Sequence, residues 1–171
     1  EYGFDIDLDY LAKSISAKTK VLILNNYQNP MSASSSKEEL EALSKLVLKH
    51  DLWVLSDDAY YEIRYSKDSP NSILNFPGMK QKTVILYTFS KKYAMTGWRI
   101  GASIGPKSLI KHMARFNIND ESCTNHFIQH ALASVLNDSN DYGEKIIKKL
   151  IKRRDLCLKK LNSISDIDIS T

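Results

Sequence analysis

The stretch Thr83-Val84-Ile85-Leu86-Tyr87-Thr88-Phe89-Ser90-Lys91 decides the fold class that this sequence favours. Its apolar part predicts a strand over residues 83–88, and polar residues with a lysine follow the strand. Two earlier apolar runs, Val21–Leu24 and Leu52–Leu55, have the length and flanks of buried strands, and polar residues also follow each of them. The same arrangement therefore occurs three times: a short buried strand that leads into polar side chains.

Helical patterns separate these strands. A capping box at Ser36 and Glu39 opens a helix that extends to about His50. The other expected elements are a helix over residues 7–16, a strand over 99–104, helices near 106–116, 121–136 and 141–161, and the start of a strand over 164–169. Strands that alternate with helices predict an α/β fold, here three α/β/α layers around a mostly parallel sheet.

Composition limits the class of protein. The chain has 171 residues, 43% hydrophobic and 26% charged, which is typical of a soluble globular domain and excludes a disordered or coiled-coil chain. No apolar run approaches the roughly 18 residues of a membrane span, so we expect no membrane partner. Two cysteines are too few for a disulfide framework or a closed zinc site, and Cys157 is expected in the core. The N-terminus has no signal-peptide pattern and no initiator Met, which predicts a cytoplasmic protein of which this chain is a piece.

Positive charge is concentrated near the C-terminus. The net charge is +4, and residues 141–162 carry eight lysines and arginines against three acidic residues. Apolar residues recur in this segment at helical spacing, so the cations are expected on the solvated face of an amphipathic helix. No run of aromatic residues is interleaved with the cations to stack with bases, and we predict no nucleic-acid partner.

The polar residues after the strands form one candidate site. Ligands of an open parallel sheet bind beyond the carboxyl ends of its strands. Asn29 follows the first strand, Asp57 and Tyr60 the second, and Thr88, Ser90 and Lys91 the third, with Arg99 eight residues beyond the lysine. An amide, a carboxylate, a phenol, an amine, a guanidinium and two hydroxyls are thus expected at one edge of the sheet.

These groups match what pyridoxal 5′-phosphate (PLP) requires. A lysine amine forms a Schiff base with the aldehyde of this cofactor. A carboxylate faces the pyridine nitrogen and keeps it protonated, so that the ring can draw off electrons from the substrate. Asn29 and Tyr60 can donate hydrogen bonds to the phenolic oxygen, and a guanidinium with hydroxyls can bind the phosphate.

Other site patterns are weaker. Neither a nucleophile elbow nor a P-loop is present, and Gly101–Gly105 is too sparse for a dinucleotide fingerprint. His126 and His130 stand four residues apart and can share a metal, but no third ligand stands out, so we expect no metal site. Taken singly, Asp57 also fits a helix cap and Arg99 a salt bridge.

Three blocks carry a resemblance to a known family. They are Asn25-Asn26-Tyr27-Gln28-Asn29-Pro30, Ser56-Asp57-Asp58-Ala59-Tyr60, and Ser90-Lys91-Lys92-Tyr93-Ala94-Met95-Thr96-Gly97-Trp98-Arg99-Ile100-Gly101. In this order and at these separations they resemble the class I/II aminotransferases of PLP fold type I. The resemblance implies that residues 1–140 are part of the PLP-binding large domain. Residues 141–171 would then be a long linking helix and the start of the small domain.

The resemblance also implies a role for each candidate residue. Lys91 would form the Schiff base and move a proton between substrate and cofactor. Asp57 would pair with the pyridinium nitrogen, while Tyr60 and Asn29 would contact the phenolic oxygen. The phosphate site would include Thr88, Ser90 and Arg99.

The implied activity is the transfer of an amino group between an amino acid and a 2-oxo acid, in a homodimer. Two alternatives stay open. One is a lyase or synthase of the same fold type, such as a carbon–sulfur β-lyase or an enzyme similar to aminocyclopropane-carboxylate synthase. The other is a non-catalytic regulatory domain. Two departures from the family pattern concern substrate handling: Tyr27 replaces a frequent proline, and Met31-Ser32 replaces Thr-Gly.

Overall fold

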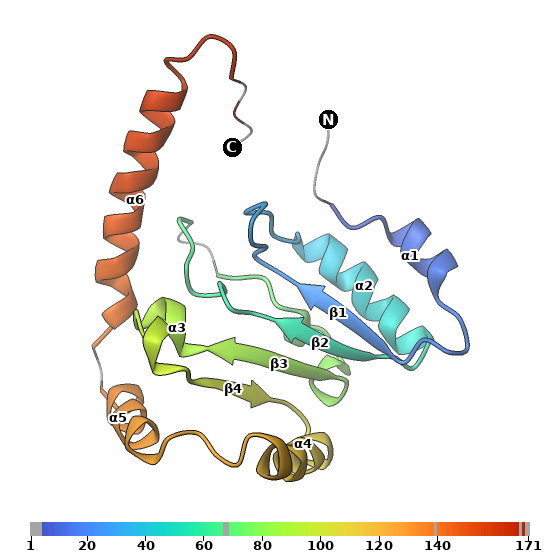
Figure 1. Cartoon of the computed structure of the whole chain (residues 1–171). Helices are drawn as coiled ribbons and strands as arrows, with labels where there is room; N and C mark the ends of the chain where they lie inside the picture. The colour runs from blue at the N-terminus through green and yellow to red at the C-terminus, as the bar shows by residue number, and fades with distance from the viewer. Residues whose placement is uncertain (1–4, 67–68, 139, 168, 170–171) are drawn as a thin grey trace.

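A four-stranded sheet lies at the centre of the fold, with strands in the order β1-β2-β3-β4 (Figure 1). The computed structural model describes residues 5–66, 69–138, 140–167 and 169. The strands are β1 (Val21–Asn25), β2 (Trp53–Asp57), β3 (Thr83–Thr88) and β4 (Gly101–Ile104). The first three run parallel, and β4 pairs antiparallel with β3. The predicted α/β fold with a mostly parallel sheet is confirmed.

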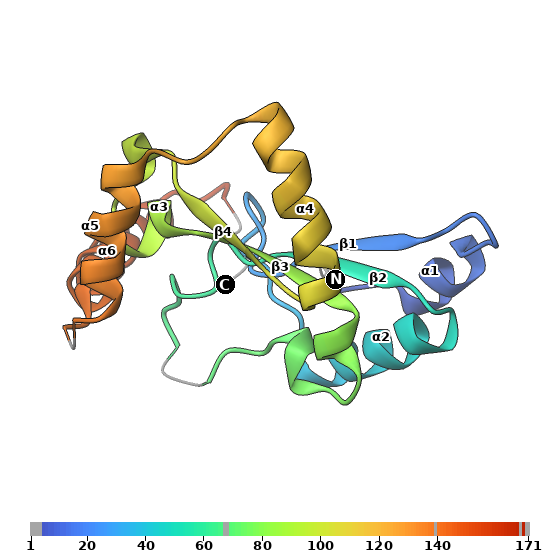
Figure 2. The ribbon, with the colours of Figure 1, turned by 90° about the horizontal axis from the view of Figure 1, so that it is seen from below.

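Helices cover both faces of this sheet. On one face lie α1 (Leu8–Ser14) and α2 (Lys37–Lys49), and on the other lies α4 (Lys107–Asp120) (Figure 2). The remaining helices are α3 (Phe89–Lys92), α5 (His126–Leu136) and α6 (Tyr142–Leu161), with short 3₁₀ turns η1 (Ile73–Asn75), η2 (Met79–Gln81) and η3 (Thr96–Trp98). The result is the expected three-layer arrangement.

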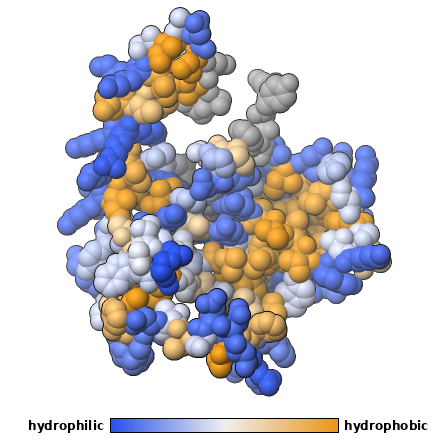
Figure 3. Space-filling model, in the orientation of Figure 1, coloured by the Kyte–Doolittle hydropathy of each residue, from blue (hydrophilic) through white to orange (hydrophobic). Residues whose placement is uncertain are grey.

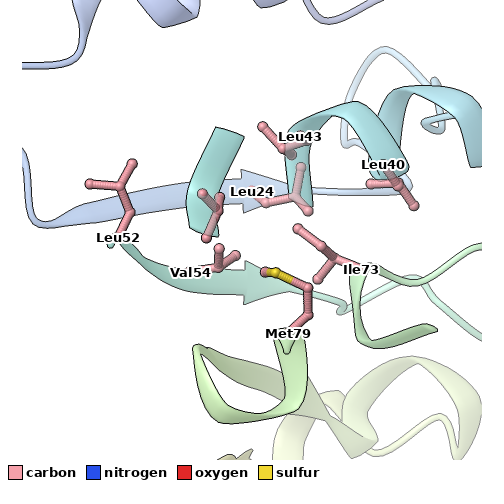
Figure 4. Close-up of a cluster of buried hydrophobic side chains, with 8 residues drawn as sticks. Leu24, Leu40, Leu43, Leu52, Val54, Ile73 and Met79 are labelled. Carbon is pink, nitrogen blue, oxygen red and sulfur yellow. The ribbon is translucent and has the colours of Figure 1, made fainter. Parts of the chain in front are cut away.

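The main core lies between α2 and the sheet. Leu40, Leu43 and Val47 recur on one face of α2, and each is at most 1% exposed. They pack on a buried set from the strands and the 3₁₀ turns, namely Leu24, Leu52, Val54, Ile73 and Met79 (Figure 4). This cluster fixes the face of the sheet on which α2 lies.

The capping box of α2 forms as predicted. The Ser36 hydroxyl accepts a hydrogen bond from Glu39 N at 3.0 Å, and the Glu39 carboxylate accepts one from Ser36 N at 2.7 Å. Glu39 also accepts from Ile6 N at 2.9 Å, which ties the segment before α1 to the start of α2.

Strand β1 is exposed, contrary to the expectation of a buried strand. Val21 is 52% and Ile23 71% exposed, and Leu24 alone in this strand is buried. β1 stands at the end of the strand order, and the face opposite α2 carries no described helix at this point. Figure 3 shows an apolar area over this part of the molecule.

Three local predictions are wrong. Helix α5 begins at His126 rather than near residue 121, because the Asn125 side chain caps it by accepting from Phe127 N at 3.2 Å. Residues 162–166 form turns and a bend, and the described part of 164–169 forms no strand. Cys157 is exposed on α6 rather than buried.

Helix α6 extends away from the sheet (Figure 1). Gly143 is its one fully buried residue, and its lysines are exposed, as the amphipathic pattern predicts. Its contacts with the rest of the chain include Gly143 beside Lys92, the Tyr142 ring 6.5 Å from that of Tyr93, and the Arg154 guanidinium 4.5 Å from the centre of the Tyr65 ring. Among the described residues, no helix has both the length and the apolar character needed to span a membrane.

Candidate active site

The carboxyl ends of β1, β2 and β3 lie at one edge of the sheet because these strands are parallel (Figure 1). The register places Asn25 beside Asp57, and Asp57 beside Leu86. The loops that leave this edge carry the predicted site residues. Each candidate therefore starts from the same edge, as the sequence analysis expects.

Two of the predicted residues, Asn29 and Lys91, contact a third, Tyr60. The Asn29 side chain donates a hydrogen bond from Nδ2 to the Tyr60 hydroxyl oxygen at 3.1 Å. Lys91 lies in α3, which follows β3, and its Nζ is 5.0 Å from the centre of the same ring. Residues 29, 60 and 91 are far apart in sequence, so the fold brings an amide, a phenol and an amine together.

The two carboxylates at the end of β2 have different surroundings. Asp57 is half-buried, and its Oδ1 accepts a hydrogen bond from Ala59 N at 3.2 Å. Asp58 is only 7% exposed, and its Oδ1 accepts from the Ser56 hydroxyl at 2.7 Å. Burial raises the pKa of Asp58, the Ser56 hydrogen bond lowers it less, and the charge of Asp57 adds to the rise. Asp57 is thus the more accessible carboxylate, and Asp58 belongs to the interior.

The adjacent lysines Lys91 and Lys92 also point to different partners. Successive residues of a helix are about 100° apart around its axis, and both lysines lie in the short helix α3. Lys92 forms an ion pair with Glu62, with 2.6 Å between Nζ and Oε1, whereas Lys91 lies over Tyr60. No sequence motif predicts a role for Glu62, because this residue lies outside the three blocks of the resemblance.

The predicted phosphate-binding residues lie on the hairpin formed by β3 and β4. Thr88 caps α3, since its hydroxyl accepts a hydrogen bond from Ser90 N at 3.2 Å, and Ser90 is 8% exposed. Gly101 pairs with Thr88, and a Cβ at this glycine would lie 2.8 Å from Tyr87 O, so the close pairing requires a glycine.

Arg99 is exposed and lies just before β4 on the same hairpin. It has a positive φ of 51°, and its Nη1 donates to Thr96 O at 2.8 Å. Among the described residues it makes no hydrogen bond to Thr88 or Ser90. The hairpin brings Arg99 to the edge that carries the other candidate residues, while its guanidinium bonds within its own loop.

An open cavity of about 720 Å³ lies beside Asn29 and Tyr60. Its wall includes Tyr27, Tyr65 and, from α6, Leu150. The Tyr27 hydroxyl donates to Asn71 O at 3.2 Å, and its ring meets that of Tyr61 edge to face at 5.9 Å. No motif in the sequence predicts this cavity, because its wall joins a strand-end loop to a helix more than 100 residues later.

A metal centre finds no support in the described part of the chain. Across those residues, no group of three or more potential ligands comes together. His126 and His130 face each other on α5, with 3.2 Å between their Nε2 atoms.

Solved structures with the same arrangement define the class of fold. An aromatic aminotransferase from Pyrococcus horikoshii superposes with a TM-score of 0.87 at 36% identity, over 95% of this chain and 44% of that chain. Aspartate aminotransferase from Thermus thermophilus with maleate gives 0.84 at 32% identity, over 94% and 42%. The fold is therefore that of the PLP fold type I proteins, of which this chain contains a part.

Sequence comparison then identifies the family. The family profile "Aminotransferase class I and II" matches residues 1–171, and the chain belongs to this family. Aromatic-amino-acid aminotransferase 2 of Thermococcus litoralis is 35% identical over 166 residues, which are 96% of this chain and 43% of that protein. Aspartate aminotransferase of Pyrococcus abyssi is 36% identical over the same shares. The chain thus spans less than half the length of the curated relatives it matches.

Proposed function

We propose that the protein is a PLP-dependent aminotransferase that moves an amino group between an amino acid and a 2-oxo acid. The contact of three predicted residues carries this proposal: Asn29 Nδ2 lies 3.1 Å from the Tyr60 hydroxyl, and Lys91 Nζ lies 5.0 Å from the centre of the Tyr60 ring. Membership of the aminotransferase family supports it. In this proposal the chain supplies the lysine, the carboxylate and half of the phosphate site.

The residues around Tyr60 fit the aldehyde side of PLP. Lys91 Nζ would bond to the aldehyde carbon. The Tyr60 oxygen already accepts a hydrogen bond from Asn29, so its own proton is available to a phenolic oxygen of the ligand. Asp57, at the end of the neighbouring strand, would face the pyridine nitrogen and keep it protonated. When bound, PLP supplies a cationic ring that accepts the electrons released at the substrate α-carbon.

The hairpin residues fit a phosphate group. The Thr88 hydroxyl accepts from Ser90 N, which leaves its proton available to donate to a phosphate oxygen. Arg99 uses Nη1 for Thr96 O, and the other donors of its planar fork would bind the phosphate. Ser90 would add a second hydroxyl.

Lys91 would also act as the acid and base of the reaction. Its Nζ would take a proton from the substrate α-carbon and return it on the cofactor side. Asn29 and Tyr60 would hold the ring in place meanwhile. The cavity beside Asn29 gives the substrate side chain a place next to these groups.

We further propose the organisation and location of the protein. Residues 1–140 would be part of the PLP-binding large domain, and residues 141–171 the linking helix and the start of the small domain. The intact protein would be a cytoplasmic homodimer. The position of α6, which leaves the sheet after Tyr142, supports the domain boundary.

Two measurements on the intact protein test the activity. PLP should give the visible absorbance band of a lysine-bound cofactor, and Lys91→Ala should abolish it. Relatives of this chain are named for aromatic amino acids and for aspartate. These amino acids are therefore the first amino-group donors to incubate with 2-oxoglutarate. Glutamate and a new 2-oxo acid support transamination, whereas ammonia and pyruvate identify a lyase. PLP binding without turnover identifies a regulatory domain.

A further inference from the structure

Two adjacent lysines, Lys91 and Lys92, lie at the candidate site. One of them, Lys92, forms an ion pair with the carboxylate of Glu62. Glu62 accepts from Lys92 Nζ through Oε1 at 2.6 Å, and its Oε2 accepts a hydrogen bond from the Tyr87 hydroxyl. Among the described residues Lys91 makes no contact with Glu62, and it extends over Tyr60 instead. Glu62 stands two residues after Tyr60, so the same loop that carries the phenol also holds the second lysine.

The surroundings of Lys92 favour its charged form. The Lys92 and Glu62 side chains are only 24% and 29% exposed, and the Tyr93 ring centre lies 5.6 Å from Nζ. Burial lowers the pKa of Lys92, but the hydrogen bond and charge of Glu62 outweigh it, and Tyr93 and Asp141 add to the rise. The net result is a raised pKa, so the ion pair stabilises the charged form of the Lys92 amine.

Space also restricts Lys92. A Cβ on Gly143, in the first turn of α6, would lie 3.1 Å from Lys92 Cγ and 3.4 Å from Lys92 Cε. The aliphatic part of this side chain therefore packs against the start of α6, between that helix and Glu62. Lys92 is held on the side of α3 that faces α6.

We propose that Glu62 determines which of the two lysines bonds to an aldehyde ligand, by holding the Lys92 amine in an ion pair and leaving Lys91 as the reacting group. This inference rests on the proposed function. In the reaction, the lone pair of a free amine attacks the aldehyde carbon, a C=N bond forms, and the oxygen leaves as water. An ammonium group has no lone pair, and an ion-paired side chain must first leave its partner.

Chemical trapping in the intact protein tests this inference. Borohydride reduces the C=N bond between PLP and a lysine to a stable amine, and peptide mass spectrometry then locates the modified residue. We expect modification of Lys91 in the unchanged protein. Glu62→Gln keeps the size of the side chain and removes its charge, so the Lys92 amine loses its ion pair and modification of Lys92 should rise from undetectable to a measurable share of the trapped cofactor.

Three further variants make the test specific. Asp51→Asn breaks the Lys82–Asp51 ion pair elsewhere in the fold and should leave the modified residue unchanged. Adding Lys92→Met to Glu62→Gln should return the modification to Lys91 alone, which shows that the change acts through Lys92. If Glu62→Gln fails to fold, Glu62→Asp is one methylene shorter and should also raise modification of Lys92.

The outcomes separate this inference from the proposed function. Modification of Lys91 alone, with no rise at Lys92, in both the unchanged protein and the Glu62 variants overturns the inference and leaves the proposed function intact. Absence of any modified lysine in the unchanged protein overturns the proposed function. Modification of Lys92 in the unchanged protein overturns the inference and the role given to Lys91.

Discussion

Replacing Tyr60 by phenylalanine removes one oxygen from the centre of the candidate site. The ring remains in place beside Lys91, so Tyr60→Phe changes hydrogen bonding rather than packing. The lost oxygen is the acceptor for Asn29 Nδ2 at 3.1 Å and, in the proposed site, the donor to the phenolic oxygen of PLP. Affinity for PLP is the quantity that should fall.

The size of the effect follows from the exposure of this contact. A hydrogen bond to a charged group contributes about 1.5–3 kcal/mol. The Asn29–Tyr60 pair is exposed, which places the loss near the lower end, at about 2 kcal/mol. Since each 1.4 kcal/mol is a factor of ten, the dissociation constant should rise roughly 30-fold.

Titration of the intact protein with PLP, followed by visible absorbance, measures this constant. Tyr65→Phe is the matched control, because Tyr65 lines the same cavity and its ring contacts Arg154, yet within the described part of the chain it makes no contact with Lys91. Its affinity should be unchanged. Asn29→Ala should weaken binding as well, and the double variant should lose less than the sum, because both residues act through one contact. Binding of Tyr60→Phe within about twofold of the unchanged protein would refute the placement of PLP against this hydroxyl.

Three more predictions concern the phosphate group, the core and the effect of pH. Arg99→Lys should weaken binding of PLP and of inorganic phosphate about tenfold, because lysine lacks the planar fork of arginine. The urea concentration at the midpoint of unfolding should stay the same. Unchanged affinity for both ligands would show that Arg99 is not part of the phosphate site. Leu40→Ala, at a fully buried position, should lower the free energy of unfolding in urea by about 3 kcal/mol, whereas Leu48→Ala, at 42% exposure, should cost less than about 1 kcal/mol. Burial raises the pKa of Glu39, but hydrogen bonds from Ser36 and Ile6 outweigh it and lower the pKa below its ordinary 4.5. Its contribution to stability is therefore present above pH 4.5 and lost as the pH falls through the lowered value, and Glu39→Gln should flatten this part of the urea stability profile.

The sequence predicts where most of the candidate residues lie, because they follow the ends of parallel strands. Three parallel strands end just before Asn29, Tyr60 and Lys91, and apolar runs in the sequence predict where each strand ends. Glu62 was missed for a physical reason: its partners, Lys92 and Tyr87, are 30 and 25 residues away, and only the folded loop defines the distance between them. The orientation of the Arg99 guanidinium likewise depends on a local backbone angle that no pattern encodes.

The two main errors in the predicted fold concern the burial of β1 and the first residue of α5. An apolar run predicts a strand, but burial of that strand depends on what lies on both of its faces, and β1 is open on one of them. The sequence pattern predicts that α5 begins five residues too early, because the helical pattern extends to the N-terminal side of the cap at Asn125. The capping box at Ser36 and Glu39 was predicted correctly because both of its hydrogen bonds are local in sequence.

The antiparallel direction of β4 has a consequence for how this protein can change over evolution. Because the chain turns back after β3, Thr88, Lys91 and Arg99 all lie within one hairpin, whose strand pairing runs from Thr88–Gly101 to Ile85–Ile104. Inserting or deleting even one residue between positions 88 and 101 would move the Lys91 amine or the Arg99 guanidinium relative to the paired strands. Length changes at an exposed turn such as residues 17–18 would leave both groups in place. Selection can therefore lengthen or shorten the rest of the chain while this twelve-residue connection keeps its length.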